Sequence, residues 1–259
     1  MMNGTQSREG PNPAYYLAIN EAMRLLLESG RAPGWEKVAS ASTALVARTT
    51  LPPLCYAKIY FTRSPLDRFK GLVRGDRCSR AVDANNALIA SGFKAPPVLF
   101  YGRTEGYPYM IMRALPGVSL RQYLFERPAD VAALRERRMV LRSLGTEVGR
   151  LHMAGFSHGD LRAGNVLIDT SEAGKIQIGF LDNEGTQRHR QLPEFWVIKN
   201  LAQLNMEGPA RATRTDRLRV FKAYCQQRGS TRATQRRLLG EIVERTRRRL
   251  DENAAARQA

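Results

Sequence analysis

The sequence is poor in cysteine and has no long apolar run. Its three cysteines, Cys55, Cys78 and Cys225, lie far apart and form no CxxC pair, so neither a disulfide framework nor a zinc site is indicated. No apolar stretch approaches the roughly 20 residues that a membrane-spanning helix needs. The first ten residues also lack the apolar core of a signal peptide. We therefore expect a cytoplasmic protein with reduced thiols.

Acidic residues and lysine are also scarce. There are 24 acidic residues against 41 basic ones, a formal net charge of +17, and only seven of the basic residues are lysine. Arginine binds phosphate and carboxylate groups with two parallel hydrogen bonds, so this balance favours an anionic partner: a phosphorylated substrate, an anionic membrane surface or nucleic acid. A genome rich in G and C would explain the preference for arginine over lysine equally well. Because no zinc finger or RNP motif is present, no nucleic-acid partner is expected.

The spacing of apolar residues divides the chain into a strand-rich part and a helix-rich part. A disordered lead is expected at 1–12, an N-terminal lobe with an extra helix at 13–115, and a helical C-terminal lobe at 116–259. The expected strands cover about 37–48, 55–61, 98–101 and 109–113. The expected helices cover about 14–29, 81–90, 134–155, 201–205, 215–227 and 231–249. This order predicts an α+β fold of two lobes, a small antiparallel β-rich lobe followed by a helical one.

Residues 156–169 have the pattern of a kinase-type catalytic loop. His158, Asp160 and Asn165 form H-x-D-x-x-x-x-N, a short apolar strand follows, and Asp182 ends a second apolar strand. Phosphoryl transfer needs a carboxylate to position the acceptor hydroxyl, and an amide with a second carboxylate to hold magnesium. We assign the first role to Asp160 and the magnesium to Asn165 and Asp182. Taken singly, each Asp or Asn is more often a turn or helix cap.

Two further residues of this loop are candidates for supporting roles. His158 is expected to hold the loop in shape rather than to act as an acid or base. Arg162 stands where a cation can reach the transferring phosphate, and its alternative is an ordinary surface arginine.

The candidates for nucleotide binding lie in the first half of the chain. Lys58, in the middle of an apolar strand, is the candidate for the lysine that binds the nucleotide phosphates; the alternative is a lysine that keeps an exposed strand soluble. Asp83, the only carboxylate of the helix at 81–90, is the candidate partner of Lys58, and helix capping explains it equally well. The segment that holds Arg113 and Leu115 is expected to form the hinge whose backbone meets adenine, unless its apolar residues are simply core.

A glycine-rich phosphate-binding loop is missing. Between Val38 and Arg48 the expected turn reads Ala-Ser-Ala-Ser-Thr, so small residues and hydroxyls would have to cover the phosphates. Many kinases that act on substrates other than proteins lack the G-x-G-x-x-G pattern.

Several stretches together resemble the bacterial lipopolysaccharide kinase family, the Kdo and heptose kinases. The resemblance covers most of residues 40–228. It rests on Lys58, on Gly-Phe-Lys-Ala-Pro-Pro-Val-Leu, His-Gly-Asp-Leu-Arg-Ala-Gly-Asn and Phe-Leu-Asp-Asn-Glu, and on 199–205 and 216–224. It implies a protein-kinase-like fold, ATP and Mg²⁺ as cofactors, and the roles given above to Lys58, Asp160, Asn165 and Asp182. Asp83 departs from the usual glutamate.

The resemblance implies ATP-dependent phosphorylation of a sugar hydroxyl in the inner core of lipopolysaccharide. The substrate would be an anionic glycolipid, met at the cytoplasmic face of the inner membrane, and the arginine-rich helix at 231–249 would either lie on that membrane or pack on the lobe. A Ser/Thr protein kinase is an alternative, although Leu192-Pro193-Glu194 follows Asp182 too closely for an activation segment. An aminoglycoside- or choline-type phosphotransferase, or a pseudokinase, would share the same loop.

Overall fold

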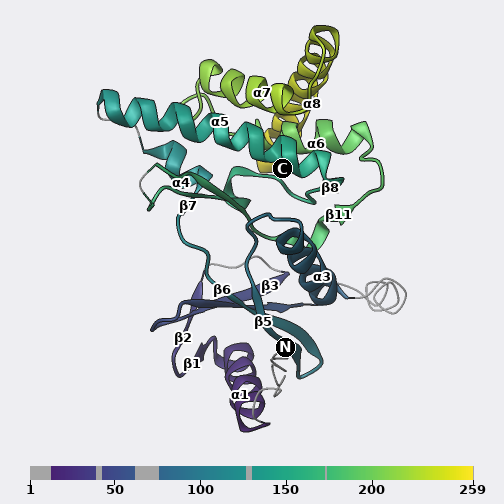
Figure 1. Ribbon diagram of the computed structural model, residues 1–259. Coiled ribbons are helices and arrows are strands. Elements are labelled where there is room, and N and C mark those ends of the chain that lie inside the picture. Colours follow the sequence, from purple (N-terminus) through teal and green to yellow (C-terminus); the bar gives the residue numbers. More distant parts are fainter. Residues whose placement is uncertain (1–12, 39–42, 62–75, 127–129, 173, 259) are drawn as a thin grey trace, which may run out of the picture. The chain divides into compact units, whose positions relative to one another are not determined.

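The computed structural model describes residues 13–38, 43–61, 76–126, 130–172 and 174–258, which form two compact units (Figure 1). The first unit contains Met1–Ser79 and Val98–Ala114, and the second contains Arg80–Pro97 and Leu115–Ala259. The helix expected at 81–90, which the sequence groups with the N-terminal lobe, therefore belongs by its contacts to the second unit. The lead at 1–12 and most of the turn expected to cover the phosphates lie outside the described residues.

The first unit is built on an antiparallel sheet of six strands, in the order β1-β2-β3-β4-β6-β5. The strands are β1 (Arg31–Ala32), β2 (Trp35–Val38), β3 (Ala44–Thr49), β4 (Cys55–Tyr60), β5 (Val98–Thr104) and β6 (Tyr107–Arg113). Strands β5 and β6 form a hairpin whose turn residues Glu105 and Gly106 both have positive φ. Because glycine enters this region without steric cost, Gly106 suits the turn. The expected antiparallel sheet is thus confirmed, with longer β5 and β6 than the apolar runs indicated.

Helix α1 (Pro13–Ser29) supplies the apolar cover of this sheet. Its first residue is proline, which suits the first turn because the N–H groups there have no acceptor within the helix. Ile19, Met23 and Leu26 follow each other at helical spacing and are buried in one cluster with Ile59 and Ile111 of the sheet. Each such side chain stabilises the fold by roughly 1.5–3 kcal/mol at most.

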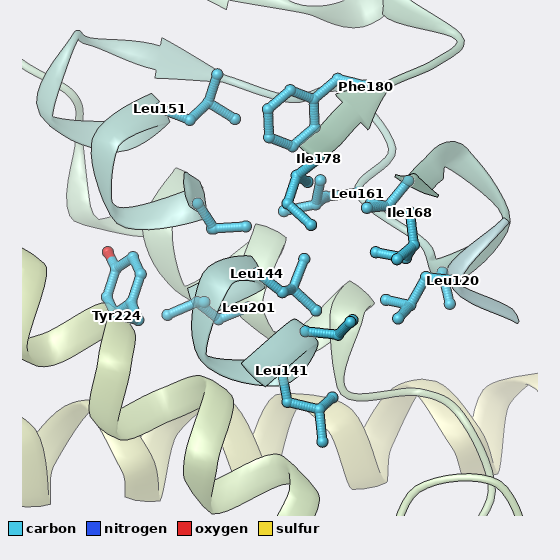
Figure 2. Close-up of a cluster of buried hydrophobic side chains, with 14 of the residues drawn as sticks. Leu120, Leu141, Leu144, Leu151, Leu161, Ile168, Ile178, Phe180, Leu201 and Tyr224 are labelled. Carbon is cyan, nitrogen blue, oxygen red and sulfur yellow. The ribbon is translucent and has the colours of Figure 1, made fainter. Parts of the chain in front are cut away.

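The second unit is mainly helical and has its own core (Figures 1 and 2). Its helices are α3 (Arg77–Ala90, of which the first three residues belong to the first unit), α4 (Leu120–Phe125), α5 (Val131–Met153), α6 (Glu194–Leu204), α7 (Arg214–Gln227) and α8 (Arg232–Gln258). Leu141, Leu144, Val148 and Leu151 of α5 are at most 2% exposed and line the core. The expected amphipathic helix is therefore present.

Two glycines let α5 and α7 approach each other closely. A Cβ atom added to Gly145 would lie 2.2 Å from the carbonyl oxygen of Val220, and one added to Gly149 would lie 2.8 Å from the side chain of Gln227. The two glycines are four residues apart and so lie on one face of α5. They form a flat strip against which α7 packs.

Helices α6 and α8 are longer than the sequence indicates. Helix α6 begins at Glu194, directly after Pro193, because the apolar run Phe195–Ile198 is helical rather than extended. Helix α8 continues to Gln258 through an alanine-rich end, a composition of high helix propensity. Its Leu238 and Ile242 are buried in the core, so the helix packs on this unit. No helix in the described part of the chain is long and apolar enough to span a bilayer.

Candidate active site

A short antiparallel ladder in the second unit brings Asn165 and Asp182 to the same end. Strand β9 (Val166–Asp169) pairs with β10 (Gln177–Phe180) so that Val166 faces Phe180, and the Leu181 N–H donates to the Asn165 carbonyl oxygen at 2.8 Å. The two residues assigned to magnesium therefore flank the last rung of this ladder. Asp182 has φ +57°, the left-handed region. That conformation costs roughly 1–2 kcal/mol for most side chains, although aspartate tolerates it better than most.

His158 connects the segment that contains Asp160 with the segment that contains Asp182. It lies after β8 (Phe156–Ser157) and is fully buried. Its Nδ1 accepts from the Asp160 N–H at 3.0 Å, so its Nε2–H donates to the Leu181 carbonyl oxygen at 3.1 Å. Burial lowers the pKa of His158 to about 4, which keeps the ring neutral at physiological pH. His158 thereby fixes Asp160 and the residue before Asp182 through one rigid ring.

The carboxylate of Asp160 is oriented by three side chains. Arg162 Nε lies 2.8 Å and Asn165 Nδ2 lies 3.1 Å from its Oδ2, and Gln203 Nε2 lies 3.3 Å from its Oδ1. The side chain of Asp160 is 29% exposed, so a substrate hydroxyl can reach it. Arg162, proposed from the sequence as a ligand of the transferring phosphate, forms an ion pair with Asp160 in this structure.

Sequence reasoning missed two amides of α6 that hold the loop from behind. Asn200 Oδ1 accepts from the His158 N–H at 3.0 Å, and its Nδ2 donates to the His158 carbonyl oxygen at 2.6 Å. Gln203 Oε1 accepts from the Leu161 N–H at 3.1 Å. Two amide side chains three residues apart share one face of a helix, and that spacing in 199–205 is the signal that could have revealed them.

The same network continues into the core of the unit. His152 of α5 places Nε2 at 3.2 Å from Asn200 Oδ1 and Nδ1 at 3.0 Å from the Tyr224 hydroxyl, which also accepts from Arg228. Burial lowers the pKa of His152 to about 3 and raises that of Tyr224 to about 12. Both groups are therefore uncharged at neutral pH, and the network stabilises the loop through hydrogen bonds.

Close backbone contact fixes the loop against the segment that follows β10. A Cβ atom added to Gly159 would lie 2.5 Å from the Cα of Gly185, at the end of the 3-10 turn η2 (Asn183–Gly185). The buried Asn183 donates to the Phe180 carbonyl oxygen and to Asn85 Oδ1 of α3, each at 2.9 Å. Glycine at 159 and 185 is thus required by the space available.

Helix α3 turns Asn85 toward this segment and leaves Asp83 exposed. The helix also begins earlier than expected, because the Asp76 carboxylate accepts from the Ser79 N–H at 2.8 Å and caps its first turn.

The remaining nucleotide candidates are distributed over both units. Lys58 lies in the middle of β4, between Val46 of β3 and Met110 of β6, with its ammonium 5.1 Å from the centre of the Tyr60 ring. Arg113 is the exposed last residue of β6. Leu115 begins the second unit's longer segment and lies against Gly179 of β10.

The donor set suits magnesium rather than a transition metal. No cluster of three or more His, Cys, Asp or Glu side chains able to hold a metal occurs in the part of the chain that the structure describes. Asn165 and Asp182 offer one amide and one carboxylate, and Mg²⁺ is commonly bound by one or two such oxygens with water and substrate phosphates completing its shell. The Asn165 amide nitrogen donates hydrogen bonds to Asp160, so Oδ1 is the atom with which Asn165 would bind Mg²⁺.

The fold and this loop define the chain as a kinase-like phosphotransferase that acts on a hydroxyl group. Its sequence matches the lipopolysaccharide kinase (Kdo/WaaP) family over residues 76–224, more than half of the chain, and the protein belongs to that family. No curated protein matches the sequence. The family and the kinase-like fold implied by the sequence motifs are both confirmed.

Three solved structures have a similar fold. WaaP in complex with acyl carrier protein is 20% identical, with 87% of this chain and 95% of that chain covered and a TM-score of 0.58. An aminoglycoside-3'-phosphotransferase of type VIII is 16% identical, with 87% and 99% covered and a TM-score of 0.57. WbdD is 17% identical, with 82% and 50% covered and a TM-score of 0.50. At these identities the similarity establishes the fold alone.

Proposed function

We propose that this protein uses ATP to phosphorylate a sugar hydroxyl, on Kdo or heptose, in the inner core of lipopolysaccharide. The observation that carries the proposal is the arrangement of Asp160, Asn165 and Asp182. The neutral His158 and the pairing of β9 with β10 hold the three residues at the same end of the β9–β10 ladder. Membership of the lipopolysaccharide kinase family supports the choice of acceptor.

Asp160 is the residue that acts on the acceptor. Its partly exposed carboxylate accepts a hydrogen bond from the sugar hydroxyl, aligns the oxygen with the γ-phosphorus of ATP and takes the proton as the new O–P bond forms and ADP leaves. Hydrogen bonds from Asn165 and Gln203 keep the carboxylate in one orientation, so little reorganisation is needed. Mg²⁺ on Asn165 and Asp182 would neutralise charge on the phosphates.

The nucleotide would be bound by Lys58 at its phosphates and by backbone groups near Arg113 and Leu115 at its adenine. We leave Asp83 out of this set, because it is exposed on α3 while Asn85 occupies the buried face.

The protein would act in the cytoplasm on an anionic glycolipid, in peripheral contact with the anionic inner membrane. The net charge of +17 favours both the substrate and the surface. Because Leu238 and Ile242 are buried in the core, membrane contact would come mainly from the exposed arginines of α8.

The variant Asp160→Asn tests the chemistry. It keeps the size of the side chain but cannot take a proton, so we expect transfer to purified inner-core lipopolysaccharide to fall by about 10²–10⁴-fold. Calorimetry should find Mg-ATP binding largely unchanged. The control Glu172→Gln, on the exposed loop after β9, should keep full activity. Undiminished transfer by Asp160→Asn would remove that residue from its role.

Mass spectrometry of core lipopolysaccharide tests the acceptor in the cell. A strain that lacks the protein should lose one phosphate from the inner core, and complementation with Asp160→Asn should not restore it. An unchanged core would refute the proposed acceptor while leaving the phosphotransferase chemistry standing.

A further inference from the structure

A cluster of cations and aromatic rings lies on two neighbouring helices of the second unit, α6 and α8. Helix α6 contributes Phe195, Trp196 and Lys199, and helix α8 contributes Arg245 and Arg249; we call these five residues the α6–α8 basic cluster. The two helices pack against each other, and Asn205, directly after α6, donates to Thr246 of α8 at 3.1 Å. At the start of α6, Glu194 accepts from Arg237 at 2.8 Å. The cluster is therefore built on two fixed helices.

The aromatic rings hold two of the cations in place. Lys199 Nζ lies 4.3 Å from the centre of the Trp196 ring, and the Arg245 guanidinium lies 4.8 Å from the centre of the Phe195 ring. The two rings meet edge to face with 5.7 Å between their centres. A cation over an aromatic face is attracted to it without being neutralised. The charges of Lys199 and Arg245 thus stay available to an anion.

The positive charges repel one another. Burial lowers the pKa of Lys199, and Arg245 and Arg249 lower it further. The pKa of Arg245 is likewise lowered by burial and then by Arg248 and Arg249. The Glu252 carboxylate pairs with Arg249 at 3.3 Å. The repulsion among the cations costs free energy, and an anionic ligand would relieve that cost.

The cluster adjoins the residues that act on the acceptor. Lys199 directly precedes Asn200, which makes two hydrogen bonds with the backbone of His158. Burial and Arg245 lower the pKa of Lys199 more strongly, but the Asp160 carboxylate raises it. We therefore assign an anion held by these cations to the molecule whose hydroxyl meets Asp160.

We propose that the α6–α8 basic cluster binds a carboxylate or phosphate group already present on the acceptor sugar, and so selects an anionic sugar as substrate. The inference rests on the proposed function and names its recognition site. Helix α6 lies inside residues 76–224, the part that matches the family, and helix α8 lies outside it.

Calorimetric titration with three soluble probes tests the site. The probes are deacylated inner-core oligosaccharide, the same oligosaccharide after carboxyl reduction, and the same after dephosphorylation. The double variant Lys199→Gln, Arg249→Gln should weaken binding of the untreated probe by about tenfold, the effect of losing two partly exposed ion pairs. For the probe that lacks the recognised anion, the double variant and the unaltered protein should have the same affinity. In transfer assays the KM for the acceptor should rise while kcat stays the same.

The control and the contrary results separate this proposal from the proposed function. Arg247→Gln, exposed on another side of α8, should bind all three probes normally. An equal loss for all three probes, or no loss for any, would overturn the proposal, as would the absence of binding to the unaltered protein. The anion is a carboxylate if both proteins bind the carboxyl-reduced probe equally well. It is a phosphate if they bind the dephosphorylated probe equally well. Binding that obeys these expectations without phosphate transfer would instead count against the proposed function.

Discussion

At the scale of single residues, the site depends on side chains that stay neutral because they are buried. His152 and His158 each use both ring nitrogens in hydrogen bonds. Protonation of either ring would remove the hydrogen bond that its unprotonated nitrogen accepts. The catalytic loop is thus held by a network that works only in one protonation state. This makes the loop sensitive to acid.

We expect the free energy of unfolding to fall in mild acid. Burial lowers the pKa of His152 to about 3 and of His158 to about 4, whereas a histidine in the unfolded chain has a pKa near 6.5. Below pH 6.5 the unfolded chain therefore binds protons that the folded protein does not. Above that pH the histidines are neutral in both states and do not change the free energy of unfolding with pH. Between pH 6.5 and about pH 4 the free energy of unfolding falls by about 1 kcal/mol per pH unit for each histidine.

Urea unfolding at several pH values measures this decline. A His152→Gln variant should be less stable at neutral pH but should lose less stability on acidification than the unaltered protein. Equal pH dependence of the two proteins would contradict the assignment of a lowered pKa to His152.

At the scale of elements, glycine permits the contacts that set the loop and the helices. Gly159 lies against Gly185 in the site, and Gly145 lies against the backbone of α7 in the core. A backbone atom that meets a new Cβ cannot turn away as a side chain can. The positions of α5 and α7 therefore depend on the absence of one methyl group.

A pair of glycine substitutions tests this dependence. Gly145→Ala places a Cβ 2.2 Å from the Val220 carbonyl oxygen, and we expect it to lower the free energy of unfolding by about 1–3 kcal/mol. Gly240→Ala on α8 meets nothing within 4 Å and should raise that free energy by up to about 1 kcal/mol, because alanine is the better helix former. Thermal unfolding measures both. If Gly145→Ala proved as stable as Gly240→Ala, the close packing of α5 on α7 would be refuted.

At the scale of the whole molecule, the excess of arginine favours an anionic partner. Helix α8 was expected either to lie on the membrane or to pack on the lobe, and its buried Leu238 and Ile242 show the packing. Deleting the helix would therefore expose the core, so substitution is the better test of membrane contact. Arg232 and Arg236 are exposed on the first turns of α8 and suit this purpose.

We expect Arg232→Gln, Arg236→Gln to bind anionic vesicles more weakly. Each arginine near such a surface contributes on the order of 1 kcal/mol, so the double variant should lose roughly 10- to 30-fold in affinity. Sedimentation with phosphatidylglycerol vesicles measures the loss, and phosphatidylcholine vesicles serve as the neutral control. Equal binding by both proteins would exclude these arginines as the membrane contact.

The sequence itself determined the order of elements and the residues of the loop. Helical spacing in α5, alternating strands in the first unit, and the H-x-D-x-x-x-x-N pattern are local signals, because each depends on neighbours within a few residues. The same signals missed α4, most of α6 and the end of α8. Short helices and apolar runs take their form from what they pack against, and periodicity does not record that.

The tertiary structure decided which residues support Asp160 and which do not. Asn200 and Gln203 reach the loop from about 40 residues further along the chain, and Asn85 reaches Asn183 across 98 residues. The exposure of Asp83, the pairing of Arg162 with Asp160 and the cations of α6 and α8 likewise follow from packing over long separations. A motif of fixed spacing can specify the catalytic loop, because its geometry is local. The side chains that orient it are brought together only by the fold.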